Sequence, residues 1–346
     1  MSAGPDNPVI ERAAGSLHIA GSAVVIGRIR MGDGSRLAQG AVVRARDGAV
    51  EVGTGSAVLE NSVVIGNAAM PTTIGRRTVF GHRCTIVGAT VGDLCEIGNG
   101  TILMPGATLG DRIFLGEGTL VPAGMTLADD SVAVGRPARI IRRASPEDLD
   151  RLAGLRDGDL SLPPPTTTVV EAPQEASPMG QLYAFRDVMP TVAPSATLFA
   201  TAEITGDVVI GARTVIGAGV KIIGDSHGPV RIGADVQILE NTVLHLLPDN
   251  SLIIGDGVVI GPGSMIHGCH IGAGSIVEPA AIVCDGSELG EGCIVRAGSV
   301  VKQRSRFDAG TDIDGFPGRA VGRTERPLPT PAWAFAPGDL PDLAAT

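Results

Sequence analysis

Aliphatic residues recur at every sixth position over long runs of this chain. One such run extends from Val91 to Val121 in the first half, and another extends from Ile271 to Val301 in the second half. A period of six fits neither the 3.6-residue turn of a helix nor the alternation of an amphipathic strand. It is typical of a solenoid in which each hexad is a short strand and a turn, and three hexads make one triangular coil. The pattern therefore predicts stacked coils around an inner column of Ile, Val and Leu.

Glycine often follows the recurring aliphatic residue, as in "VIGAG" and "HIGAG". Such positions suit the corners of a coil, where a positive φ is often needed. The repeat resembles that of the hexapeptide-repeat proteins, which form a left-handed parallel β-helix. The left-handed coil is what this resemblance implies, because crossover connections are usually right-handed.

The hexads are themselves duplicated, at an offset of about 180 residues. "VEVGTGSAVLENSVVIG" (50–66) matches "VRIGADVQILENTVLHL" (230–246). We expect an all-β chain with two tandem β-helix domains, 16–155 and 183–322, and a short helix at the end of the first. That helix is predicted from "SPEDLDRLAGL", where Ser145 is an N-cap and Pro146 is the first helical residue. Residues 156–182 are expected to form an extended linker, and 323–346 a Pro-rich tail that packs through Trp333.

The amino-acid composition and charge limit the kinds of partner that we expect this protein to bind. The 346 residues include 49 Gly but only one Trp and one Tyr, which argues against a helical bundle. A formal charge of −10 without a basic run disfavours nucleic acid and anionic membranes as partners. No apolar stretch approaches ~20 residues, and the N-terminus lacks the features of a signal peptide. With five scattered cysteines read as reduced thiols, we expect a cytoplasmic protein.

Two histidines mark the candidate site. "ENTVLH" ends in His245, and His267 lies in "IHGC". With "YAFRDVMPTVAPSA" and "IGDSHGPVRIG", these segments resemble the γ-class carbonic anhydrases, a family that binds zinc or iron through three histidines. The resemblance covers nearly all of residues 183–320 and, more weakly, the first half. Where the family has its other histidine, five positions before His267, this chain has Pro262, which cannot bind a metal.

The first half supplies the missing residue. Its counterpart of Pro262 is His82, whereas its counterparts of His245 and His267 are Ile65 and Val87. His245 and His267 are three hexad steps apart, so we expect them on the same face, about 4.8 Å apart. Position 82 points off another face. In the γ family the third ligand comes from a neighbouring subunit, and we therefore predict that His82 of one domain joins His245 and His267 of the other around one zinc or iron ion.

The resemblance also implies a chemistry. Three imidazoles and an open position are typical of a catalytic metal, whose bound water can ionise near neutral pH. Asp225 and Glu240 are assigned as catalytic because they match family positions that orient such a site; Asp225 matches the Asp of an R-G-D motif, and Glu240 replaces an Asp. Hydroxide attack on CO2 or another small carbonyl electrophile is the expected reaction. The enzyme would then be a metal-dependent lyase or a hydrolase acting on a small molecule.

Three other functions stay open at this point. A metal-dependent thioesterase or other hydrolase would use the same three histidines. A hexapeptide acyltransferase would need no metal, since that class uses a single histidine as base and an acyl-CoA or acyl carrier protein as donor. An inactive scaffold would keep the histidines as remnants. The flat faces of such a prism usually pack into trimers, so we expect a homo-oligomer, in the form of a trimer.

Overall fold

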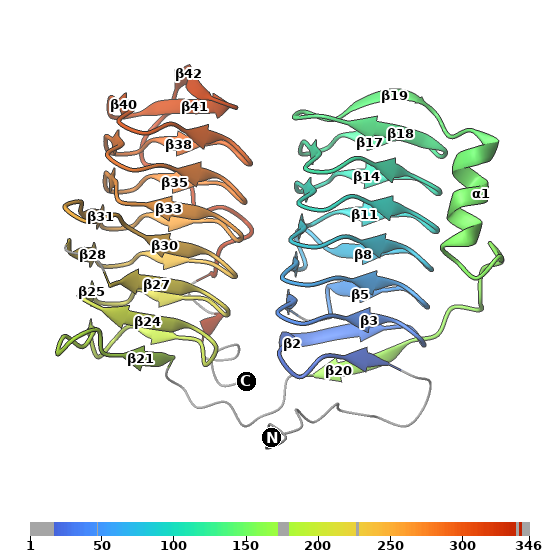
Figure 1. The fold of residues 1–346 in the computed structure, drawn as a ribbon, viewed down its shortest axis with the longest axis horizontal. Helices are drawn as coiled ribbons and strands as arrows, with labels where there is room; N and C mark the ends of the chain where they lie inside the picture. Colours follow the sequence, from blue (N-terminus) through green and yellow to red (C-terminus); the bar gives the residue numbers. More distant parts are fainter. Residues whose placement is uncertain (1–16, 47, 172–179, 226–227, 337–338, 341–346) are drawn as a thin grey trace. The chain divides into compact units, whose positions relative to one another are not determined.

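The computed structural model describes residues 17–46, 48–171, 180–225, 228–336 and 339–340. Residue 16, residues 172–179 of the expected linker and residues 337–338 and 341–346 of the expected tail lie outside the described residues. The chain forms two compact units, Met1–Ala172 (unit 1) and Pro173–Thr346 (unit 2). Each unit is a stack of parallel coils, which confirms the prediction of tandem left-handed β-helices (Figure 1).

Unit 1 has three faces of stacked strands, and β2 bends from the second face into the third. The first face consists of β1 (His18–Ile19), β3 (Arg36–Leu37), β6 (Ala57–Val58), β9 (Val79–Phe80), β12 (Glu96–Ile97), β15 (Phe114–Leu115), β18 (Ser131–Val134) and β19 (Arg139–Arg143). The second consists of β2 (Val24–Met31), β4 (Val42–Ala45), β7 (Val63–Gly66), β10 (Thr85–Val87), β13 (Ile102–Leu103) and β16 (Leu120–Val121). The third adds β5 (Val50–Val52), β8 (Thr72–Ile74), β11 (Thr90–Val91), β14 (Thr108–Leu109), β17 (Thr126–Leu127) and β20 (Thr168–Glu171).

Unit 2 repeats this plan with three separate sheets. The first sheet consists of β21 (Gln181–Tyr183), β24 (Glu203–Gly206), β27 (Lys221–Gly224), β30 (Val243–His245), β33 (Met265–His267), β36 (Ile282–Val283) and β39 (Val300–Val301). The second consists of β22 (Thr191–Val192), β25 (Val208–Ile210), β28 (Val230–Ile232), β31 (Leu252–Ile254), β34 (His270–Ile271), β37 (Glu288–Leu289) and β40 (Arg306–Phe307). The third consists of β23 (Thr197–Leu198), β26 (Val215–Ile216), β29 (Gln237–Ile238), β32 (Val259–Ile260), β35 (Ile276–Val277), β38 (Ile294–Val295), β41 (Thr311–Gly315) and β42 (Gly318–Arg323).

The recurring aliphatic residues form the core of each prism, as the six-residue period predicts. Val91 and Val121, at the ends of the run in unit 1, are at most 1% exposed, and the recurring aliphatic residues between them are at most 5% exposed. In unit 2 the same holds for Val277, Val283 and Val301. An antiparallel strand closes the last coil of each stack, because β19 pairs with β18 and β42 pairs with β41.

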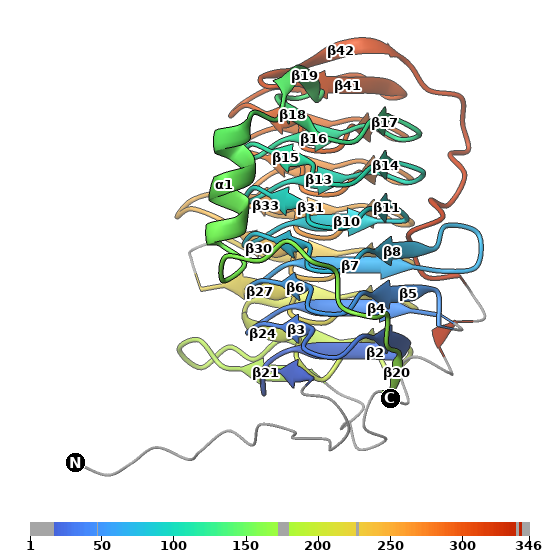
Figure 2. The same ribbon diagram turned by 90° about the vertical axis from the view of Figure 1, so that its right-hand side faces the viewer.

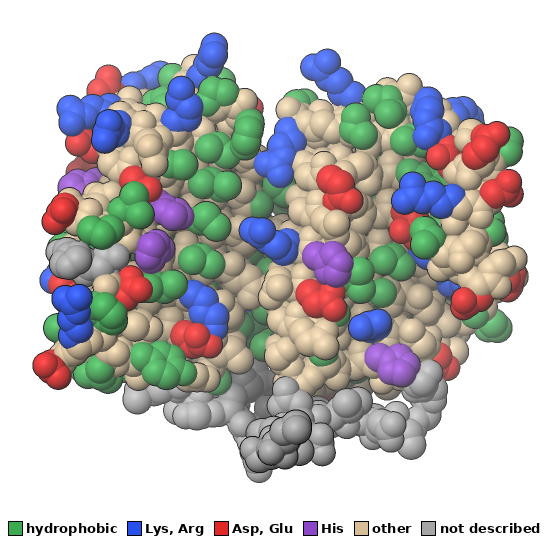
Figure 3. Space-filling view, in the orientation of Figure 1, with side chains coloured by type: hydrophobic (Ala, Val, Ile, Leu, Met, Phe, Trp, Pro, Cys, Tyr) green, Lys and Arg blue, Asp and Glu red, His purple; other side chains and the backbone are tan. Residues whose placement is uncertain are grey.

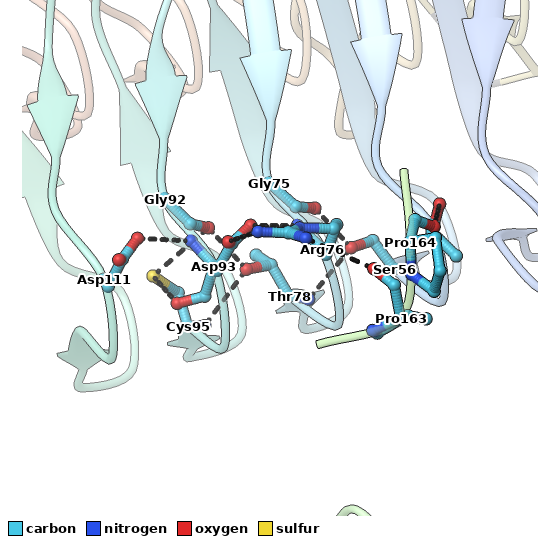
Figure 4. Close-up of polar contacts among 11 residues, drawn as sticks. Ser56, Gly75, Arg76, Thr78, Gly92, Asp93, Cys95, Asp111, Pro163 and Pro164 are labelled. Carbon is cyan, nitrogen blue, oxygen red and sulfur yellow. Dashed lines mark hydrogen bonds and ion pairs between the residues drawn. The ribbon is translucent and has the colours of Figure 1, made fainter. Parts of the chain in front are cut away.

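Aspartates at one corner of unit 1 tie successive coils together (Figure 4). Asp93 Oδ1 accepts a hydrogen bond of 2.6 Å from the backbone N–H of Arg76, one coil earlier. Asp111 Oδ1 accepts one of 2.8 Å from the N–H of Asp93, and Asp129 continues the series. Because each carboxylate satisfies a backbone donor that the corner would leave unpaired, the ladder holds the coils in register.

The predicted helix is α1 (Pro146–Gly154), which runs along the outside of the unit 1 coils (Figure 2). Ser145 caps it, with a capping box completed by Asp148. The chain after the helix lies along unit 1 as well: Arg77 donates to the carbonyls of Arg156 and Ser161, and Arg76 donates to that of Pro163. Strand β20 then pairs with β2. The first part of the expected linker is therefore bound to unit 1.

Arg156 anchors this segment. Its side chain is 9% exposed, forms an ion pair with Glu96 and donates to the carbonyl of Arg77.

We expect Arg156→Leu to lower the free energy of unfolding by about 1.5–3 kcal/mol, because hydrogen bonds from a charged group are lost and Glu96 keeps no partner guanidinium. Urea denaturation measures this. The control is Arg151→Leu in α1, expected to stay within about 0.5 kcal/mol of wild type; an equal loss in both variants would contradict the anchoring role.

Candidate functional site

His245 and His267 lie side by side on unit 2. They end the neighbouring strands β30 and β33 and are paired in register, as their spacing predicts. Each follows an inward residue, Leu244 or Ile266, so the alternation of a strand turns both imidazoles outward. The ring centroids are 5.8 Å apart and the ring planes are nearly perpendicular. Histidine side chains are visible at the surface in the view of Figure 3.

A carboxylate flanks each end of this pair. Asp225 follows β27, and its Oδ1 lies 3.6 Å from Nε2 of His245. Asp285 follows β36, and its Oδ2 lies 3.5 Å from Nδ1 of His267. Both separations exceed a hydrogen bond, so the contacts are electrostatic. The result is a histidine column of Asp225, His245, His267 and Asp285 that crosses four successive coils.

The column alone does not fit a three-ligand zinc or iron ion. A catalytic site needs three protein ligands around one point. In the described part of unit 2 no third His, Cys, Asp or Glu completes such a group with His245 and His267. The predicted third ligand, His82, belongs to unit 1. The shared metal site, and zinc or iron as its cofactor, therefore stay predictions.

Asp225 and Glu240 occupy different surroundings. Asp225 lies beside His245, where a group that orients the imidazole would be. Glu240 lies in the corner between β29 and β30, before the strand that ends in His245, and its side chain is fully buried. The catalytic role expected for these two residues stays a prediction.

Of the three histidines predicted as metal ligands, His82 lies closest to a carboxylate. It lies in the corner between β9 and β10 of unit 1, and Glu60 lies in the same corner one coil earlier. Nδ1 of His82 is 2.7 Å from Oε2 of Glu60. Asn99, one coil later, accepts a hydrogen bond of 2.7 Å from the backbone N–H of His82. Glu60 thus contacts the imidazole and Asn99 holds the backbone of His82, while the His82 side chain stays 54% exposed.

Glu60 is suited to hold the imidazole in one tautomer. A hydrogen bond from its own backbone N–H, and next the contact with His82, lower the pKa of the Glu60 carboxyl below its ordinary value, against an opposing effect of burial. Oε2 is shielded from solvent and accepts no hydrogen bond within the described residues, so its contact with Nδ1 of His82 is electrostatic. A carboxylate so close to Nδ1 favours the tautomer that carries its proton there, which leaves Nε2 as an acceptor.

The thiols are poor candidates for a nucleophile. All five cysteines are free, and only Cys284 is more than slightly exposed. Burial raises the pKa of Cys84 and of Cys95 to about 12. Burial likewise raises the pKa of the Cys269 thiol, which packs in the core of unit 2.

Two partners were missed by the sequence analysis. Asp285 lies 18 residues after His267, which is three hexads, so counting one coil forward would have found it. Glu60 was not among the candidate site residues. The coil between Glu60 and His82 is 22 residues long, because it contains the Asn67–Met70 turn. That insertion hides the stacking from a count of hexads.

Comparisons with known proteins show which proteins this chain is similar to. A model for the hexapeptide repeat of succinyl-transferase matches residues 71–105 and 251–279. The carnitine operon protein CaiE of Escherichia coli K12 is 35% identical over 139 residues, which are 40% of this chain and 70% of that protein. A hexapeptide transferase family protein of Anaplasma phagocytophilum is 29% identical, with a TM-score of 0.41, over 42% of this chain and 86% of that one. AntD, an N-acyltransferase of Bacillus cereus, is 18% identical, with a TM-score of 0.26, over 42% of this chain and 86% of that one.

The expectation of a γ-carbonic-anhydrase-like lyase is wrong on these findings. The matching repeat is that of a succinyl-transferase, and the curated relative that this chain matches is CaiE rather than a carbonic anhydrase. The error has a physical reason: the six-residue period specifies the prism, whereas the reaction depends on a few side chains grafted on it.

No helix in the described parts of the chain is long and apolar enough to cross a membrane. The aliphatic period, the two stacked prisms and the match to CaiE agree with one another. The chain belongs to the hexapeptide-repeat family, together with CaiE.

Proposed function

We propose that this protein is an acyltransferase that moves an acyl group from a thioester donor to a hydroxyl or amine of a small molecule. The observation that carries the proposal is the 2.7 Å contact between Nδ1 of His82 and Oε2 of Glu60. It is the shortest of the contacts between a predicted histidine and a carboxylate. The match to a succinyl-transferase repeat supports the same class of reaction.

The chemistry assigns one role to each residue. Nε2 of His82 accepts the proton from the acceptor O–H or N–H while the oxygen or nitrogen attacks the thioester carbonyl carbon. The tetrahedral intermediate then expels the thiolate, which takes the proton back from the imidazolium. The products are the acylated acceptor and a free thiol, so charge and protons balance. Glu60 stabilises the transient imidazolium and touches neither substrate, which makes it a positioning residue.

Acyl transfer is tested with acetyl-CoA or succinyl-CoA and a panel of amino and hydroxy compounds, with the acylated product measured by mass spectrometry. We expect an acceptor-dependent product, and we expect the rate to survive dialysis against EDTA, since imidazole base catalysis needs no metal. A protein-free reaction is the control. Thioester hydrolysis without acceptor, abolished by EDTA and restored by zinc, would contradict the proposal and favour a metal-dependent thioesterase.

A further inference from the structure

The segment 324–335 of unit 2, within the Pro-rich tail, is fixed at both ends. At its start, Thr324 donates from Oγ1 to the carbonyl of Gly292 (2.7 Å). At its end, the backbone of Phe335 forms two hydrogen bonds with the Gln237 side chain, and its ring stacks on Phe199. Trp333 is buried beside this end. The segment between, 325–332, therefore bridges the surface of the coils as a strap.

A cavity of about 540 Å³ lies beneath the strap. Its walls include Val259 and Ile276, which are neighbours on β32 and β35. The strap residues 327–331, "PLPTP", form its roof. This volume lies within the range of small-molecule sites, and the lining combines aliphatic side chains and proline rings with about as much polar surface.

The floor of the cavity is bare backbone. Gly257 and Gly274 lie at the same corner of successive coils, with φ of +65° and +63°. A Cβ atom at either position would meet no atom within 4 Å, so the open space reaches the main chain. Because successive coils are about 4.8 Å apart, these corners and the next one, Gly292, form a track about 10 Å long. An extended, unbranched ligand matches this shape.

Arg326 closes one end of the track. Its stem covers Gly292, where a Cβ atom would collide with Cδ of Arg326. The guanidinium is 3.7 Å from Oε2 of Glu291, beyond hydrogen-bond distance, and it forms no hydrogen bond with the residues that the structure describes. Glu291 is 70% exposed and can keep its water. Five N–H donors at the mouth of the cavity favour an anionic group, and a carboxylate binds such a fork with two oxygens.

We propose that this cavity binds a small carboxylate with an unbranched hydrocarbon chain. The chain lies on the glycine track against Val259 and Ile276, and the carboxylate meets Arg326. This binding site is independent of the acyl transfer proposed for His82, because all of its lining belongs to unit 2.

The test measures binding of straight-chain alkanoates from butanoate to dodecanoate to the full chain by calorimetry, with the fluorescence of Trp333, the single tryptophan, as a second readout. We expect Kd to fall about fourfold for each added methylene until the track is full, from about 0.8 kcal/mol per buried CH2. Decanol and decylamine should bind at least tenfold more weakly than decanoate. No binding of decanoate at millimolar concentration, or tighter binding of decylamine through Glu291, would overturn the proposal.

Two variants separate the cavity from a nonspecific surface. Gly274→Asn fills the track without backbone strain, because asparagine tolerates positive φ and Asn241 already has φ +54° in this unit. We expect at least a tenfold loss of decanoate affinity. The matched control, Gly124→Asn, lies at an open corner of unit 1 with φ +69° and should bind as wild type does. Arg326→Gln should weaken decanoate but not decanol. Unchanged decanoate affinity in Gly274→Asn, with the fold intact by circular dichroism, would refute the site.

Discussion

Replacing His82 with alanine is expected to lower kcat for acyl transfer by about 10²–10⁴-fold, the usual contribution of a general base. The loss should be mainly in kcat, because Nε2 acts on the proton that leaves the acceptor during attack and contributes little to ground-state binding. The measurement is steady-state kinetics with the acyl acceptor found in the product screen. The His82 side chain is half-exposed, so the substitution should leave the fold unchanged.

Two further variants test the assignment. His267→Ala, in the histidine column of unit 2, is the matched control and should keep near wild-type kcat. If His267→Ala abolished transfer while His82→Ala did not, the base would be in the other unit. Glu60→Gln should lower kcat less than His82→Ala with KM nearly unchanged, and Glu60→Asp should recover part of the loss, since a carboxylate is what holds the imidazole proton on Nδ1.

Lowering the pH removes the contribution of the Glu60 carboxylate to the stability of the folded protein. The pKa of Glu60 is lowered in the folded protein, so its carboxylate favours the folded state at pH values above the ordinary range of a glutamate. That contribution disappears as the pH falls through the lowered pKa. Near neutral pH Glu60 is therefore ionised and can stabilise an imidazolium.

The sequence predicted the fold well because the fold depends on a local rule. Each inward aliphatic residue marks one strand, and the spacing of such residues determines the coil. The run from Val91 to Val121 could be placed on the three faces of unit 1 by counting alone. The same count placed His245 beside His267, since both follow an inward residue by one position.

The site was harder to predict, because its chemistry depends on contacts between coils of unequal length. Glu60 and His82 meet across the coil that contains the Asn67–Met70 turn. The cavity beneath the strap depends on where an irregular tail is tied, and neither Gln237 nor Thr324 carries a pattern that predicts the contacts of Phe335 and Gly292. The reaction class could not be predicted from periodicity, since different chemistries share this prism.

Replacing Phe80 with alanine is expected to lower the free energy of unfolding by about 3–5 kcal/mol, the usual cost of emptying an aromatic core position. Phe80 is fully buried and stacks in register between Val58 and Ile97 of the neighbouring coils. Parallel coils cannot close around the missing ring without breaking backbone hydrogen bonds such as that from the N–H of Gly81 to the carbonyl of Ile97 (2.8 Å). Calorimetry should show a fall in Tm of about 6–20 °C, at roughly 2–4 °C per kcal/mol for a unit of this size.

The position of Phe80 also connects the core to the proposed site. Phe80 is two residues before His82, so loosening this coil should disturb the contact between His82 and Glu60 as well. Ile260→Ala, at the matching position of unit 2, is the control: it should lower stability by about 2–5 kcal/mol and leave the His82 corner intact. Below the melting range, transfer should therefore fall in Phe80→Ala and persist in Ile260→Ala. Phe80→Leu refills most of the space and should cost less than half as much stability as Phe80→Ala. An equal cost for both substitutions would mean that the coil does not pack tightly around the ring.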